Sequence, residues 1–126
     1  MVAEPRTWVD VEGAVRDWTR DEVASVDRRV FFGFNIKGPV QQIVLFRIGG
    51  PDDRCLIQFD VWAADKAQAA SIAAELATAA DRLSHSVQGA VLLHGALVES
   101  VRWQPDEEGN QPRYVVDVMF MASASS

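Results

Sequence analysis

The sequence predicts a single α+β domain over residues 1–126, with a long helix and an N-terminal helix packed on one face of a mainly antiparallel sheet of about five strands. Three observations support this class. Consecutive β-prone segments are joined by short turns containing Gly or Pro, which favours antiparallel pairing. Residues 65–86 are rich in alanine and have helical periodicity. Of the 126 residues, 48% are hydrophobic and 24% charged, which suits one domain with its own core.

We expect residues 1–8 to form an N-terminal arm that precedes the first helix. Asp10 is a suitable N-cap because its side chain can accept a hydrogen bond from a backbone N–H of the first turn. Apolar residues then recur with spacings that place them on one buried helical stripe, namely Trp8, Val11, Val15, Trp18 and Val26.

Three strands are predicted next, over residues 30–36, 42–48 and 55–62, with turns at Gly38-Pro39 and at residues 49–53. In the third strand, four alternate residues are apolar and point to one side, namely Cys55, Ile57, Phe59 and Val61. Gln58 and Asp60 point to the other side. This period of two predicts a strand that is buried on one face.

The long helix begins after Asp65, its predicted N-cap, and extends to about Ser86. Its core-facing stripe contains Ala69, Ile72, Leu76, Ala80, Leu83 and Val87. The opposite side of the helix is also rich in alanine. Either these small side chains let a neighbouring subunit approach closely, or they simply reflect the high helix propensity of alanine.

The last quarter of the chain predicts a closing hairpin. Residues 91–94 form a short strand or an extended connection, and residues 96–103 and 113–122 flank a polar linker that is rich in Pro, Gly and Asn. Residues 123–126 are then a polar tail.

Charge and motifs exclude several classes of function. The net charge is −6 with only two lysines, Lys37 and Lys66, so the basic surface needed to bind phosphates is missing. Residues 1–10 do not resemble a signal peptide, and no apolar run is long enough to span a membrane, so a soluble product made in the cytoplasm is expected. Cys55, the single cysteine, is expected to be a small buried residue.

No catalytic or metal-binding motif is present: the sequence lacks a P-loop, GxGxxG, HExxH and CxxC. His85, placed in the last helical turn, and His94 have no further ligands at a suitable spacing. Asp60, Glu99 and Asp117 lie in the middle of predicted strands. They would form an acid/base pair, a solvated face, or a surface facing a partner or pore; without a nucleophile we expect no catalytic residue, no metal and no cofactor.

Four segments, in this order and spacing, resemble the tail terminators (tail-completion proteins) of long-tailed bacteriophages, the siphophages, notably those that infect actinobacteria. They are RVFFGFNIKGP (residues 29–39), VLFRIGG (44–50), FDVWAADKAQAASIAAEL (59–76) and RWQPDEEGNQPRYVVDV (102–118). The resemblance covers roughly residues 10–122 and is weakest in the first helix.

The resemblance implies an α+β fold, a homohexameric ring and a structural role in the virion without cofactor or catalysis. Such a ring caps the head-proximal end of the tail tube, ends polymerisation of the major tail tube protein, and provides the attachment surface for head-side neck and connector proteins. DNA passes through its channel without specific binding. The protein would be made in the host cytoplasm and end in the neck region of the tail.

Within this role, position and charge indicate candidate residues. A closing ring needs a heterologous interface between identical subunits. We expect the subunit or tube interface to include Phe31, Phe32, Ile43, Leu45, Glu107, Glu108, Arg113 and Tyr114. Asp60 and Asp117 are the candidate channel-facing acids, since negative charge repels passing DNA.

Two alternatives remain open. One is another neck component, such as a stopper or head–tail joining protein. The other is a small-molecule-binding α+β domain, which would have an apolar pocket near its tryptophans, Trp8, Trp18, Trp62 and Trp103.

Overall fold

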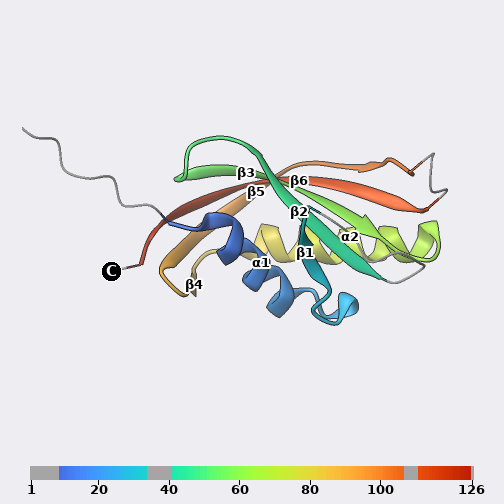
Figure 1. Ribbon diagram of the computed structural model, residues 1–126, viewed down its shortest axis with the longest axis horizontal. Coiled ribbons are helices and arrows are strands. Elements are labelled where there is room, and N and C mark those ends of the chain that lie inside the picture. Colours follow the sequence, from blue (N-terminus) through green and yellow to red (C-terminus); the bar gives the residue numbers. More distant parts are fainter. Residues whose placement is uncertain (1–8, 34–40, 107–110, 126) are drawn as a thin grey trace, which may run out of the picture.

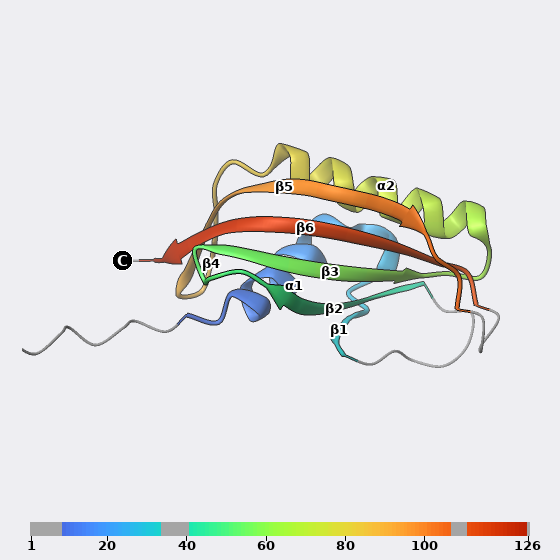
Figure 2. The same ribbon diagram turned by 90° about the horizontal axis from the view of Figure 1, so that it is seen from above.

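The computed structural model describes residues 9–33, 41–106 and 111–125. Two α-helices lie together on one side of a twisted sheet (Figures 1 and 2). In chain order the elements are α1 (Val11–Glu22), a 3-10 turn η1 (Ala24–Val26), β1 (Val30–Phe32), β2 (Gln42–Gly49), β3 (Arg54–Trp62), α2 (Lys66–Arg82), β4 (Ser86–Gln88), β5 (Val91–Trp103) and β6 (Arg113–Ala124).

The predicted α+β class is confirmed, and the sheet is larger than predicted. It has six strands in the order β1-β2-β3-β6-β5-β4. Every neighbouring pair is antiparallel except β1 and β2. The sheet is therefore mixed, with five strands forming an antiparallel body and β1 added at one edge.

The antiparallel pairing expected between the first two strands is wrong. Val30 lies beside Ile43 and Phe32 beside Leu45, so β1 runs parallel to β2. A strand of three residues is only about 10 Å long. The nine residues 33–41 that connect the two strands are enough to span this length, so a parallel pairing is possible although the sequence suggested a short turn. The predicted turn at Gly38-Pro39 lies outside the described residues.

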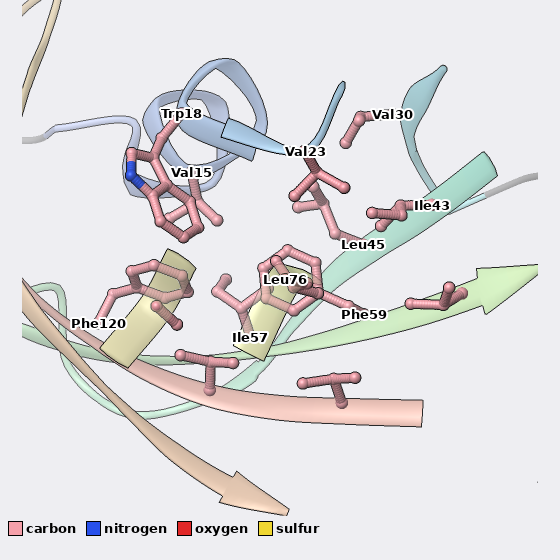
Figure 3. Packing of buried hydrophobic residues seen from close by; sticks show 14 of the residues in the cluster. Val15, Trp18, Val23, Val30, Ile43, Leu45, Ile57, Phe59, Leu76 and Phe120 are labelled. Carbon is pink, nitrogen blue, oxygen red and sulfur yellow. The ribbon is translucent and has the colours of Figure 1, made fainter. Parts of the chain in front are cut away.

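The core lies between the helices and the sheet face that they cover (Figure 3). Trp18 of α1 packs edge-on against Phe120 of β6, with ring centroids 5.5 Å apart and planes at 74°. Phe59 of β3 lies 6.1 Å from the same ring. The alternation predicted for β3 is confirmed, because all four alternate residues are fully buried, namely Cys55, Ile57, Phe59 and Val61, whereas Leu56 between them is only half-buried.

Both predicted N-caps are confirmed. The Asp10 carboxylate accepts a hydrogen bond from the Gly13 N–H at 2.9 Å, and that of Asp65 accepts one from the Gln68 N–H at 2.8 Å. These bonds satisfy backbone donors that the first helical turn leaves unpaired. Val26 is buried as predicted, but it belongs to η1, because α1 ends at Glu22.

Helix α2 ends four residues earlier than predicted. Its last residue is Arg82, and the chain then extends through His85 into the short strand β4. His85 is therefore outside the helix, and Val87, predicted on the core stripe, is 53% exposed. Pairing of β4 with the start of β5 outweighs the helical periodicity here, because three backbone residues gain strand partners.

The closing hairpin is confirmed and is longer than predicted. Strand β5 runs without a break through the two segments that the sequence separated, with register shifts at residues 93–95 and 98–100. Strand β6 reaches Ala124, so Ser123 and Ala124, predicted in the polar tail, pair with Leu92 and Val91. Near its tip the hairpin closes through a bridge between Asp106 and Gln111.

Candidate functional site on the open face of the sheet

One face of the sheet is not covered by either helix (Figure 1). Along β3 the side chains between the core residues point to this face, and the register places Gln58 opposite Asp117 of β6. Strand β5 adds Ser100, which is the register partner of Asp117 on the other side. Six polar side chains meet here, and we call them the open-face cluster: Gln58, Asp60, Ser100, Arg102, Arg113 and Asp117.

Asp117 is held by two side chains of β5. Arg102 Nη1 donates to Asp117 Oδ2 at 2.6 Å, and Ser100 Oγ donates to the same oxygen at 3.1 Å. Arg102 also donates to Ser100 Oγ at 2.7 Å. The register shift between Val98 and Ser100 sets which β5 side chains reach β6, so this bulge positions the group.

Asp60 forms the second half of the open-face cluster. Its Oδ1 accepts a hydrogen bond from Gln58 Nε2 at 3.1 Å, and its Oδ2 lies 3.5 Å from Arg113 Nη1. The Arg113 guanidinium also stacks over the Trp62 ring at 5.0 Å and donates from Nε to the Gln104 carbonyl at 2.8 Å. A planar guanidinium suits these simultaneous contacts.

Asp60 is an unusual acid for an uncovered sheet face, since it is only 7% exposed. Burial raises the pKa of its carboxyl, and the negative charge of Asp117 raises it further. The Gln58 hydrogen bond and the positive charge of Arg113 oppose this shift. Burial is the largest of these effects, so the ionised form of Asp60 is less favourable in the folded protein than in water.

The charges of the open-face cluster balance one another. Each of its two acids is paired with an arginine, so it is locally close to neutral. Within the described residues, the buried atoms Asp117 Oδ1 and Trp62 Nε1 have no hydrogen-bond partner. The structure brings together the two candidate channel acids, Asp60 and Asp117, with the predicted interface residue Arg113.

The other predicted interface residues are scattered. Ile43 and Leu45 are fully buried between sheet and helices, so they are removed from the predicted interface (Figure 3). Glu107 and Glu108 lie outside the described residues.

Two aromatic pairs account for the remaining predicted residues. Phe31 and Phe32 are half-buried, and the Arg16 guanidinium lies 4.7 Å from the Phe32 ring centre. Tyr114 packs against the core, with its ring centroid 5.3 Å from that of Trp103. Trp103 is 38% exposed and also lies under the Lys66 ammonium. Phe31 and Phe32 therefore lie on the edge strand β1, whereas Trp103 and Tyr114 lie on β5 and β6, on the other side of the sheet.

Sequence reasoning missed Gln58, Ser100 and Arg102 as partners of the two acids. The period of two in β3 put Gln58 on the same side as Asp60, which was a usable signal. No such signal existed for Ser100 and Arg102, because the bulge in β5 shifts their register and only the folded hairpin shows where they point.

A groove of 540 Å³ lies on the helix side, between α1, α2 and the segment that leads into β4. Its rim carries the charged side chains Glu22, Glu75 and Arg82 together with His85. Trp18 contributes to its floor but is only 2% exposed. The groove is polar and open, unlike the apolar pocket that a small-molecule-binding domain was expected to have near its tryptophans.

The other chemistry-bearing side chains of the described residues are two histidines and one cysteine. Residues 9–33, 41–106 and 111–125 contain no cluster of three or more His, Cys, Asp or Glu side chains suited to a metal ion. His94 Nε2 is 2.7 Å from Ser123 Oγ. Burial raises the pKa of the Cys55 thiol to about 11. No helix among the described residues is long and apolar enough to cross a membrane.

Comparison of the sequence with protein-family models and with curated proteins finds no match in either. The fold defines the class of protein: a small α+β domain with a mixed sheet that is covered by helices on one face only (Figure 2).

Proposed function

We propose that this protein is the subunit of a ring that caps the head-proximal end of a siphophage tail tube. The observation that supports this most is the one-sided sheet. Helices cover one face, which leaves the open face and the long edge of β5 for contacts with other molecules. Together with the four ordered segments that resemble tail terminators, this favours a subunit of an assembly.

The charge distribution is compatible with a channel that DNA crosses. The chain has a net charge of −6, which repels a polyanion at long range. In the open-face cluster the arginines are tied to Asp60 and Asp117, so they are less available to hold phosphates. A wall of this kind would let DNA slide past.

In this role the ring stops polymerisation of the major tail tube protein and offers its other surface to head-side neck and connector proteins. No step requires a cofactor. The virion neck is the proposed location, and the subunit works through contacts with copies of itself and with tube subunits. Arg113 and Tyr114, at the start of β6, remain candidates for these contacts.

Deletion of the gene in its phage, followed by electron microscopy, tests the proposal. Loss of a terminator gives overlong or unfinished tails, and the wild-type gene supplied in trans restores the normal length. Loss of a stopper or head–tail joining protein instead gives tails of normal length detached from filled heads. That second result would replace the proposed function with the neighbouring neck role.

A further inference from the structure

The large apolar side chains that are exposed lie in strands at or next to the two edges of the sheet. Within the described residues they are Ile48 in β2, Val87 in β4, and Leu97, Val101 and Trp103 in β5. The two central strands, β3 and β6, have none. Single exposed apolar residues are common on protein surfaces, but their concentration towards the two sides of the sheet suits an intermolecular contact.

Strand β5 is an open edge over most of its length. Strand β4 pairs only with Val91–Leu93, so residues 94–103 have no strand partner on that side among the described residues. The unpaired N–H and C=O groups of such an edge are a template for another strand. Leu97, Val101 and Trp103 lie along this same stretch, which we call the β5 edge.

The opposite edge of the sheet is partly closed and partly open. At β1 the Arg20 guanidinium donates to the Val30 carbonyl at 2.8 Å and so blocks that acceptor. However, β1 covers only residues 43–45 of β2. Residues 46–49 continue beyond it, and Ile48 there is 45% exposed. We call residues 46–49 together with Arg54 the β2 edge.

The two edges carry complementary charges. Glu99 lies at the bulge of the β5 edge, and Arg54 lies at the start of β3, where β3 pairs with the end of β2. Both side chains are exposed, and neither forms an ion pair within the described part of the chain. The β5 edge therefore carries the acid Glu99 among apolar side chains. The β2 edge, on the other side of the sheet, carries the base Arg54 beside Ile48.

We infer that the β5 edge of one copy of this chain packs against the β2 edge of the next copy, head to tail. The contact joins two different surfaces, so it is heterologous and can close into a ring. Backbone groups of the edges and the apolar side chains supply affinity, and Glu99 against Arg54 sets the register. This assignment rests on the proposed ring and adds the surfaces that would form it.

Cross-linking of cysteine variants tests the contact. Leu97→Cys, Ile48→Cys and the double variant are treated with a short bismaleimide over a range of protein concentrations. The native Cys55 is buried and its thiol pKa is raised, so it serves as a silent background. A head-to-tail contact gives a ladder of multimers with the double variant only. Dimers formed by Leu97→Cys alone would show a two-fold contact and overturn the inference, as would a double variant that stays monomeric.

A charge exchange provides a second, independent measurement. Glu99→Arg and Arg54→Glu each place like charges at the contact, so each is expected to lower the multimer fraction in sedimentation at least several-fold, and the double exchange restores it. Glu22→Arg, an exposed change on the helix side, is the control. If the multimer fraction of each single variant equals that of the control, the assignment of the two edges is overturned. Because tail length in the phage is a separate readout, a failed edge contact with terminated tails would leave the proposed function standing.

Discussion

Arg102 and Asp117 join the two strands of the closing hairpin through an N–O distance of 2.6 Å on the open face of the sheet. The side chain of Asp117 is largely buried, with 16% of its surface exposed, and that of Arg102 is 43% exposed. The pair is thus partly shielded from solvent, which makes it stronger than an ordinary surface ion pair.

Arg102→Ala is expected to lower the free energy of unfolding by about 1 kcal/mol, because it leaves the buried carboxylate of Asp117 without its cation. Urea unfolding of dilute protein measures this change. Arg54→Ala is the matched control, since Arg54 is an exposed arginine of the same sheet that forms no ion pair with any described residue. Equal stability of the two variants would refute a structural role for the pair.

Asp60→Asn is expected to make the protein more stable than the wild type at neutral pH. The pKa of Asp60 is raised by burial from 3.8 in the unfolded chain. Between 3.8 and the folded pKa the native state binds more protons than the unfolded state, so wild-type stability falls as the pH rises through this window. Asn keeps an acceptor for Gln58 and does not ionise.

Unfolding of both proteins between pH 3 and pH 8 measures the effect. The stability difference in favour of Asp60→Asn should widen as the pH rises from 3.8 and then level off above the folded pKa. A difference that narrows with rising pH would mean that Arg113 stabilises the ionised carboxylate by more than burial disfavours it.

Cys55 is expected to be unreactive in the native protein. Its side chain is fully buried, and its thiol pKa of about 11 leaves almost no thiolate at pH 8. Labelling with an aromatic disulfide reagent should proceed only at the rate at which the chain unfolds, and should become fast in denaturant. Rapid labelling of the folded protein would contradict the burial of β3 against the helices.

Gly50→Ala is expected to destabilise the protein by about 1–3 kcal/mol. Gly50 has a φ of +82°, and a Cβ there would lie 2.1 Å from the Arg54 carbonyl oxygen. Gly49→Ala is the neighbouring control, because a Cβ at that position meets nothing within 4 Å. Thermal unfolding compares them. Similar midpoints for the two variants would show that the turn between β2 and β3 does not need a glycine at position 50.

The helices were predictable because their signals are local. Asp65 and the apolar stripe through Ile72 and Leu76 locate α2, and Asp10 locates the start of α1. The buried face of β3 likewise follows from alternation alone. The direction of β1 did not follow, because the sequence between β1 and β2 resembles a short turn, which favours antiparallel pairing, whereas the two strands pair in parallel.

The open-face cluster was predictable only in part. Asp60 and Asp117 stood out as acids within strands, but their proximity depends on β3 and β6 being neighbours although α2 and two strands separate them in sequence. The arginine partner of Asp117, Arg102, lies beyond the bulge near Glu99, and Arg113 reaches Asp60 through the register of β6 with β3. Such long-range register is not encoded in any local pattern, so the pairing of each acid with an arginine emerged only from the folded sheet.

Tube length in a polymerisation reaction tests the central claim most directly. The major tail tube protein of the same phage is allowed to polymerise with increasing amounts of this protein, and tube lengths are measured by electron microscopy. A terminator is predicted to shorten the tubes as its concentration rises and to leave a ring of density at one end. Tube lengths that do not change, with no density at either end, would contradict the account.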